Sequence, residues 1–272
     1  MRSRSYILLI LLVLVTSCGE LEKLLKSEDY DLKKTKAKEY YDNGQYVKAT
    51  ELLAQLIPRY RATGEAEDLN WLNAQSYYKM KDYYSAGTYL KSYVDQYPFG
   101  KYTEEASFMG SLCDYNISPR AELDQENTRN AIEGFNVFMN RYPFSPRIEE
   151  CKRLLKEIEE KLVEKSYMSA KLYYDMKQYK AAVTALTNSL KNYSDTKYRE
   201  EMMFLKLNSL FLFAENSLVM RQKERYQATL DDYYSFMEEF PESKYSREVK
   251  RIYQKTSEYL NIGIIEPVAN NQ

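Results

Sequence analysis

The chain has 272 residues, with 39 Lys and Arg against 40 Asp and Glu, and it contains no histidine. The near-neutral charge leaves no basic footprint for nucleic acid, and the missing histidine excludes Ser-His-Asp and Cys-His catalysis and histidine-containing zinc sites. Because only 8 Gly and 7 Pro are present, a turn-rich β fold is disfavoured and we expect an all-α chain.

The first residues resemble an export signal. Two arginines precede an apolar run over residues 6–15, which is too short to cross a bilayer. The run ends in Val-Thr-Ser-Cys at 15–18, which resembles the lipobox of bacterial lipoproteins. We therefore predict a signal peptide over residues 1–17 and a covalent lipid on Cys18, where several acyl chains would give a stable membrane anchor. The alternative is an ordinary cleaved signal peptide with a chance cysteine.

A helix-turn-helix pattern then occurs five times. In its clearest copies small, aromatic and large apolar residues recur at helical spacings: Ala37, Tyr40, Tyr46, Ala49 and Leu53, then Ala74, Tyr77, Tyr83, Ala86 and Leu90. This is the tetratricopeptide (TPR) pattern, and such a pair buries its apolar face only when copies are stacked. We predict a TPR-type α-solenoid of about five helix-turn-helix repeats plus a C-terminal closing helix.

The predicted boundaries follow from this pattern. Residues 18–31 are polar and charged, so we expect a lipidated N-terminus and a tether there. The solenoid spans residues 32–261, and residues 262–272 form a tail. The repeats are expected over about 32–60, 66–98, 103–143, 147–194 and 197–241, with the closing helix over 244–261.

The corners between repeats share a second motif. They read Tyr-Pro-Phe-Gly at 97–100, Tyr-Pro-Phe-Ser at 142–145, Tyr-Ser-Asp-Thr at 193–196 and Phe-Pro-Glu-Ser at 240–243. An aromatic residue closes one helix, proline stops it, and a small or capping residue starts the next. Since no Gly or Pro interrupts residues 147–175, we predict one long helix there.

Catalytic chemistry is not indicated. The glycines are isolated, so no phosphate-binding loop is present, and the carboxylates between residues 149 and 160 alternate with Lys and Arg as on a solvated helix face. Two further cysteines, Cys113 and Cys151, are interpreted as small core residues, because their helical register separates them by more than a disulfide allows. We therefore predict a non-enzymatic protein without a cofactor other than the lipid on Cys18.

Since the sequence does not indicate catalysis, we expect the chain to act by binding partners. TPR solenoids usually present a concave face formed by the first helices of their repeats. In the pairs Tyr40-Tyr41 and Tyr77-Tyr78 one ring is expected in the core and the other available, so Tyr41 and Tyr78 are candidate partner-binding residues. Trp71 is either core packing between repeats 1 and 2 or a groove anchor. Repeats 1 and 2 keep a near-standard period, which makes them the candidate peptide-receiving groove.

Residues 97–200 resemble a known family. The segments that carry the resemblance are FMGSLCDY, DQENTRNAIEGFNVFMNRYPFSPR, YMSAKLYYDMKQYKAAV and NYSDTKYRE. Together with the signal, the lipobox and five divergent TPRs, they look like the BamD family of outer-membrane assembly lipoproteins. The resemblance is weakest in repeat 1, around residues 60–67, and in repeat 5, which carries extra length.

The resemblance implies partners and a location. BamD-like proteins bind the barrel-forming BamA subunit and other subunits of the β-barrel assembly machinery, and they receive unfolded outer membrane proteins. They are lipid-anchored at the periplasmic face of the outer membrane. Family members have an arginine after the corner that leads into repeat 5, and Arg199 is the nearest match, one position out of register. The alternatives are a TPR-type surface lipoprotein that binds glycans, or another periplasmic TPR scaffold.

Overall fold

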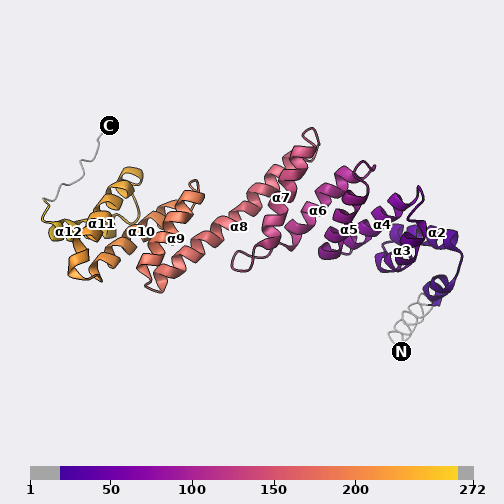
Figure 1. Ribbon diagram of the computed structural model, residues 1–272, viewed down its shortest axis with the longest axis horizontal. Coiled ribbons are helices and arrows are strands. Elements are labelled where there is room, and N and C mark those ends of the chain that lie inside the picture. Colours follow the sequence, from indigo (N-terminus) through magenta and orange to yellow (C-terminus); the bar gives the residue numbers. More distant parts are fainter. Residues whose placement is uncertain (1–18, 263–272) are drawn as a thin grey trace, which may run out of the picture. The chain divides into compact units, whose positions relative to one another are not determined.

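The computed structural model describes residues 19–262, and all regular secondary structure in that part of the chain is helical (Figure 1). The predicted signal peptide, Cys18 and the predicted tail beyond Ile262 lie outside the described residues. The chain divides into two compact units, residues 1–159 (unit 1) and 160–272 (unit 2), with the boundary inside helix α8. Among the described helices, none combines the length and the apolar character that a membrane crossing requires.

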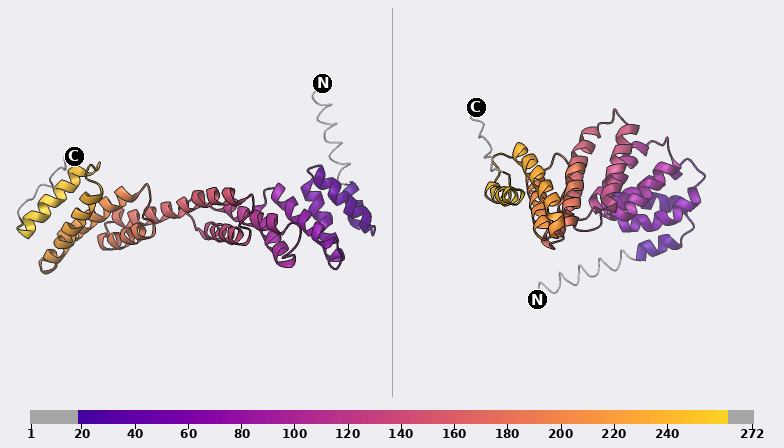
Figure 2. Two further views of the ribbon diagram at one scale, coloured as in Figure 1. Left: turned by 90° about the horizontal axis from the view of Figure 1, so that it is seen from above. Right: turned by 60° about the vertical axis from the view of Figure 1, so that its left-hand side comes forward.

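Each unit is a stack of helix pairs, which can be followed in Figures 1 and 2. Unit 1 holds α2 (Tyr30–Asp42), α3 (Tyr46–Tyr60), α4 (Ala66–Lys79), α5 (Tyr83–Gln96), α6 (Thr103–Ile117), α7 (Glu126–Arg141) and the first part of α8 (Ile148–Asp175). Unit 2 holds the rest of α8, then α9 (Tyr179–Asn192), α10 (Arg199–Glu215), α11 (Val219–Glu239) and α12 (Ser246–Leu260). The predicted all-α fold of five TPR-type pairs and a closing helix is confirmed.

The turns inside three of the pairs have the same backbone. Gly44, Lys81 and Lys177 take up left-handed conformations, with φ of 72°, 60° and 58°. In each turn the next amide bonds a carbonyl five residues back: Gln45 N to Tyr40 O (2.7 Å), Asp82 N to Tyr77 O (3.1 Å) and Gln178 N to Tyr173 O (2.9 Å). These bonds satisfy carbonyls at the helix end, and they close the turn whether glycine or lysine occupies the left-handed position.

The four corners between repeats are also alike. The closing aromatic residues have φ between −126° and −132° and ψ between 63° and 71°: Tyr97, Tyr142, Tyr193 and Phe240. Each donates its amide to the carbonyl four residues earlier, at 2.8 or 2.9 Å. Ser194 stands where the other three corners have proline, so the preceding backbone does not depend on the proline ring.

Small residues let the helices of each pair approach closely. Ala37, Ala49, Ala74, Ala86 and Ala182 are completely buried. Large side chains such as Leu90, Phe135 and Phe138 fill the space around them in unit 1, as Phe211 and Phe236 do in unit 2. Cys113 and Cys151 lie in the unit 1 core as free thiols, and burial raises their pKa values to about 12 and about 11.

The N-terminal segment differs from the expected tether. Residues 19–26 are helical, and Leu21 and Leu24 are buried against the first repeat. The buried Lys33 holds this helix, because its Nζ donates to Leu25 O (3.2 Å) and to Gln55 Oε1 (2.6 Å). Two leucines three residues apart share a helix face, so a mostly polar segment still packs onto the fold.

Candidate functional site: a groove on the first helices of unit 1

Unit 1 carries a groove of about 700 Å³ over the first helices of its opening repeats. Its walls come from α2 and α4 and from the two residues that precede α6. The lining residues are Lys34, Thr35, Lys38, Tyr41, Asp42, Glu65, Asp68, Leu69, Trp71, Leu72, Lys101 and Tyr102. A groove across consecutive first helices is the surface by which TPR stacks bind extended partners.

Aromatic rings line part of the groove. Trp71 stacks on Tyr102 with ring centroids 4.6 Å apart and planes 7° apart. Glu67 fixes this arrangement, since its carboxylate accepts hydrogen bonds from the Tyr93 hydroxyl and from the Lys101 amide (2.7 Å). These contacts tie the α4 wall to the start of α6, so the rings present a preformed surface.

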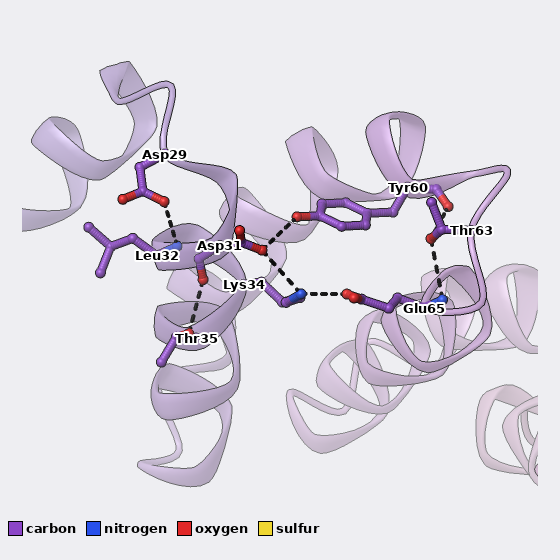
Figure 3. Close-up of polar contacts among 8 residues, drawn as sticks. All are labelled: Asp29, Asp31, Leu32, Lys34, Thr35, Tyr60, Thr63 and Glu65. Carbon is purple, nitrogen blue, oxygen red and sulfur yellow. Dashed lines mark hydrogen bonds and ion pairs between the residues drawn. The ribbon is translucent and has the colours of Figure 1, made fainter.

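Ion pairs hold one rim of the groove. Lys34 Nζ lies 2.5 Å from a Glu65 oxygen and 3.4 Å from Asp31, and Asp31 also accepts from the Tyr60 hydroxyl at 3.2 Å (Figure 3). The Glu65 hydrogen bond raises the pKa of Lys34 above its ordinary value. The network crosses from α2 to the start of α4 and fixes the two helices that form opposite walls.

Side-chain caps fix the helix ends that carry these charges. Asp29 accepts from the Leu32 amide at 2.9 Å at the start of α2, and Thr63 accepts from the Glu65 amide at 3.3 Å before α4 (Figure 3). Such caps satisfy amides that the helix leaves without partners. The positions of Lys34 and Glu65 therefore follow from local sequence.

The groove has no net formal charge, because three lysines face three carboxylates along its lining. Lys101 pairs with Asp68 at 2.7 Å, and this bond raises the pKa of Lys101. Lys38 is exposed and makes no ion pair within residues 19–262. Of the three lysines, Lys38 is the one available to an incoming anionic group.

The predicted site residues fall in different places. Tyr41 and Trp71 line the groove together. Tyr78 lies outside its lining and packs edge-on against Tyr83 at 5.5 Å, partly buried on the unit 1 core. Arg199 belongs to unit 2, where its guanidinium pairs with Glu239, including one contact at 2.9 Å, and donates to Ser194 O at 3.1 Å.

Sequence reasoning missed Lys34, Lys38, Lys101 and Tyr102. A signal for the last two was present, because Lys-Tyr occurs at 101–102, 197–198 and 244–245, each time just before a first or closing helix. Each of these tyrosines stacks on an aromatic residue of an earlier first helix: Trp71–Tyr102 (4.6 Å), Tyr167–Tyr198 (4.3 Å) and Phe204–Tyr245 (4.1 Å). Trp71 is therefore both a groove residue and one copy of a repeated packing contact.

Comparisons with known proteins agree on one family. The model of the YfiO family, described as "Outer membrane lipoprotein", matches residues 30–211. The outer membrane protein assembly factor BamD of Haemophilus influenzae is 24% identical over 216 residues, covering 74% of this chain and 81% of that protein. A putative BamD of Aquifex aeolicus is 25% identical over 224 residues, covering 76% of this chain and 71% of its own length.

Among solved structures, the TPR domain of P58(IPK) is 14% identical and covers 88% of this chain and 68% of its own, with a TM-score of 0.41. The family match begins at the first residue of α2 and ends within α10. It thus includes both walls of the groove and well over half of the chain, and this chain belongs to the YfiO (BamD) family of outer membrane lipoproteins.

Proposed function

We propose that this chain is a non-enzymatic scaffold lipoprotein of the outer-membrane β-barrel assembly machinery. In this proposal the groove of unit 1 receives the C-terminal strand of unfolded barrel proteins, and unit 2 holds a BamA-like subunit. The observation that carries it is the preformed aromatic groove, in a chain that belongs to a family of outer membrane lipoproteins and whose relatives are named outer membrane protein assembly factors.

The groove's chemistry suits a barrel strand. Strands of membrane barrels alternate apolar and polar side chains, so every second side chain of a bound strand can pack on Tyr41, Trp71 and Tyr102. A chain-terminal carboxylate has Lys38 as its cationic partner. Because the lining carries no net charge, we expect the affinity for a barrel-strand peptide to come mainly from apolar contacts and to change little with ionic strength.

Photo-crosslinking from single sites tests the groove. A photoreactive residue at Lys38 or Tyr41 is expected to capture a synthetic C-terminal barrel-strand peptide, while one at Tyr84, exposed on α5 outside the groove, is not. The paired substitutions Lys38→Glu and Tyr41→Ala should lower peptide affinity about tenfold, as the loss of one aromatic contact and one charge predicts. Equal capture from all three sites would rule out the groove as the receiving surface.

The location and the partner of unit 2 are tested in cells. With Cys18 lipidated at the periplasmic face, protease added to intact cells should leave the chain uncut, whereas a surface glycan-binding lipoprotein would be cleaved. Crosslinking from Arg199 is expected to yield a BamA-like barrel protein. Outer-membrane purification that recovers this chain without such a subunit would contradict the assignment.

A further inference from the structure

The turn between α10 and α11 presents three consecutive apolar side chains to solvent. Leu218, Val219 and Met220, here called the apolar tip, are 75%, 78% and 83% exposed. No other three consecutive large apolar residues between 19 and 262 are comparably exposed. The corresponding turn of the first pair reads Asn43-Gly44-Gln45, so the repeat itself does not require apolar residues at this position.

The tip projects beyond the packed part of its helix pair. The helix α11 has 21 residues, whereas the second helices of the other four pairs have 14 to 16. Its first buried residue is Tyr226, seven residues after Val219. At 1.5 Å per residue, the exposed start of α11 extends about 10 Å from the core of unit 2.

The tip is held rigidly although it is exposed. The Arg221 amide donates to Leu218 O at 2.8 Å, and the Asn216 side chain donates to Leu212 O at 2.7 Å. The Arg225 guanidinium lies 3.8 Å from the Phe213 ring centroid, which braces α11 against the end of α10. Adjacent exposed apolar side chains, unlike single scattered ones, mark a site of interaction with a protein or a membrane.

Cations outnumber carboxylates at the base of the tip. Residues 215–225 contain Arg221, Lys223 and Arg225 against Glu215 and Glu224; Glu224 lies 3.3 Å from Arg221, and Glu215 lies 3.5 Å from Lys255 of α12. The sequence therefore places apolar side chains at the end of a projection and cations directly behind them.

We propose that the apolar tip inserts into the interface of a phospholipid bilayer that carries anionic headgroups. Val219 and Met220 are consecutive in α11 and point in directions about 100° apart, and Leu218 precedes the helix with extended backbone, so the three side chains do not share one flat face. A fluid bilayer surrounds a projecting tip from every side, while the cations behind it meet lipid phosphates. This contact is separate from the lipid on Cys18 and does not rest on a role in barrel assembly.

Vesicle binding by the unlipidated chain tests the proposal. Residues 19–272, which include every described helix, are mixed with phosphatidylcholine vesicles with and without phosphatidylglycerol, and co-sedimentation is measured. We expect binding to the anionic vesicles, and the triple substitution Leu218→Ser, Val219→Ser and Met220→Ser should weaken it at least about tenfold. Arg221→Gln with Lys223→Gln should weaken it and flatten its salt dependence.

Matched exposed residues serve as the control. Phe99 and Phe144 of unit 1 are 97% and 98% exposed, and replacing both by Ser should leave vesicle binding unchanged. A fluorophore on Val219→Cys should shift to the blue with anionic vesicles, since the native cysteines are buried and escape labelling. Absent binding, equal binding by the tip variant, an equal loss in the Phe99 and Phe144 control, or an unshifted fluorophore would each overturn the proposal.

Discussion

Unit 1 and unit 2 use the same backbone motifs but present different surfaces on them. The corners of unit 1 expose Phe99 and Phe144, whereas Asp195 and Glu242 take the matching positions in the two later corners. The backbone of the closing aromatic residue is the same in all four. The corner backbone therefore does not depend on the residue two positions after the closing aromatic, which is exposed in unit 1 and free to differ between the units.

The first helices give a second contrast. In unit 1 the stack of Trp71 on Tyr102 borders an open groove, while in unit 2 the equivalent stacks of Tyr198 and Tyr245 belong to the packing of α8, α10 and α12. The repeated packing contact therefore borders the groove at its Trp71–Tyr102 copy, and the Lys-Tyr motif alone does not predict this.

The largest effect should come from matched core truncations. Phe135 in unit 1 and Phe236 in unit 2 are both fully buried, and each change to Ala should cost about 3–5 kcal/mol in the free energy of unfolding. Hydrogen exchange should show lost protection mainly in the unit that carries the change. If Phe135→Ala reduced protection equally in α10 to α12, the two units would unfold together and the division into separate stabilities would be wrong.

The fold was largely predictable from the sequence because its determinants are local. Ala37, Ala49, Ala74 and Ala86 mark close helix contacts, and the corner aromatic residues mark helix ends. The docked helix over residues 19–26 was not predicted, because Leu21 and Leu24 lie in a charged segment and their partners are distant in the sequence.

The groove was only partly predictable. Tyr41 follows from the repeat pattern, whereas Trp71 was left open between the core and a groove, and the register of neighbouring helices decides that Tyr78 packs on the core. Lys38 becomes distinctive only once the structure shows that Lys34 and Lys101 already have carboxylate partners. Pairing between distant residues is therefore the information that the sequence pattern lacks.

Opposite substitutions in the left-handed turns of the two units should change stability less than the core truncations do. Gly44→Ala in unit 1 should lower the free energy of unfolding by about 1 kcal/mol. The cost comes from the positive φ alone, because an added Cβ would meet no atom within 4 Å. Lys177→Gly in unit 2 should raise the free energy of unfolding by about 0.5–1 kcal/mol, because glycine removes the same strain. Urea unfolding measures both; a loss of stability in Lys177→Gly would mean that its side chain contributes more than the backbone strain costs.

A proline exchange at the corners should have a still smaller effect. Tyr97 and Tyr193 have nearly the same backbone, so Ser194→Pro should fit unit 2 and raise the free energy of unfolding by about 0.4–1 kcal/mol through the unfolded state. Pro98→Ser in unit 1 should lower the free energy of unfolding by a comparable amount. Thermal unfolding of both variants checks the pair, and destabilisation by Ser194→Pro would show that the fourth corner is not equivalent to the first.

The smallest effect concerns Arg199, and its pH dependence separates a structural role from a binding role. The hydrogen bond from Arg199 lowers the pKa of Glu239, so the pair's stabilisation is present above the unfolded carboxyl pKa of about 4.3 and is lost as the pH falls through the lower folded pKa. Because both side chains are about a third exposed, Arg199→Gln should cost only about 0.5 kcal/mol at pH 7, and this cost should shrink in acid.

Arg141 of unit 1 provides the comparison for this last prediction. It donates to Pro98 O at 2.8 Å and makes no ion pair among the described residues, so the cost of Arg141→Gln should not change between pH 7 and acid. Urea unfolding across this range distinguishes the two arginines. A flat profile for Arg199→Gln would mean that Glu239 contributes little to folding, and any loss of partner co-purification in that variant would then report on the guanidinium's contact with the partner.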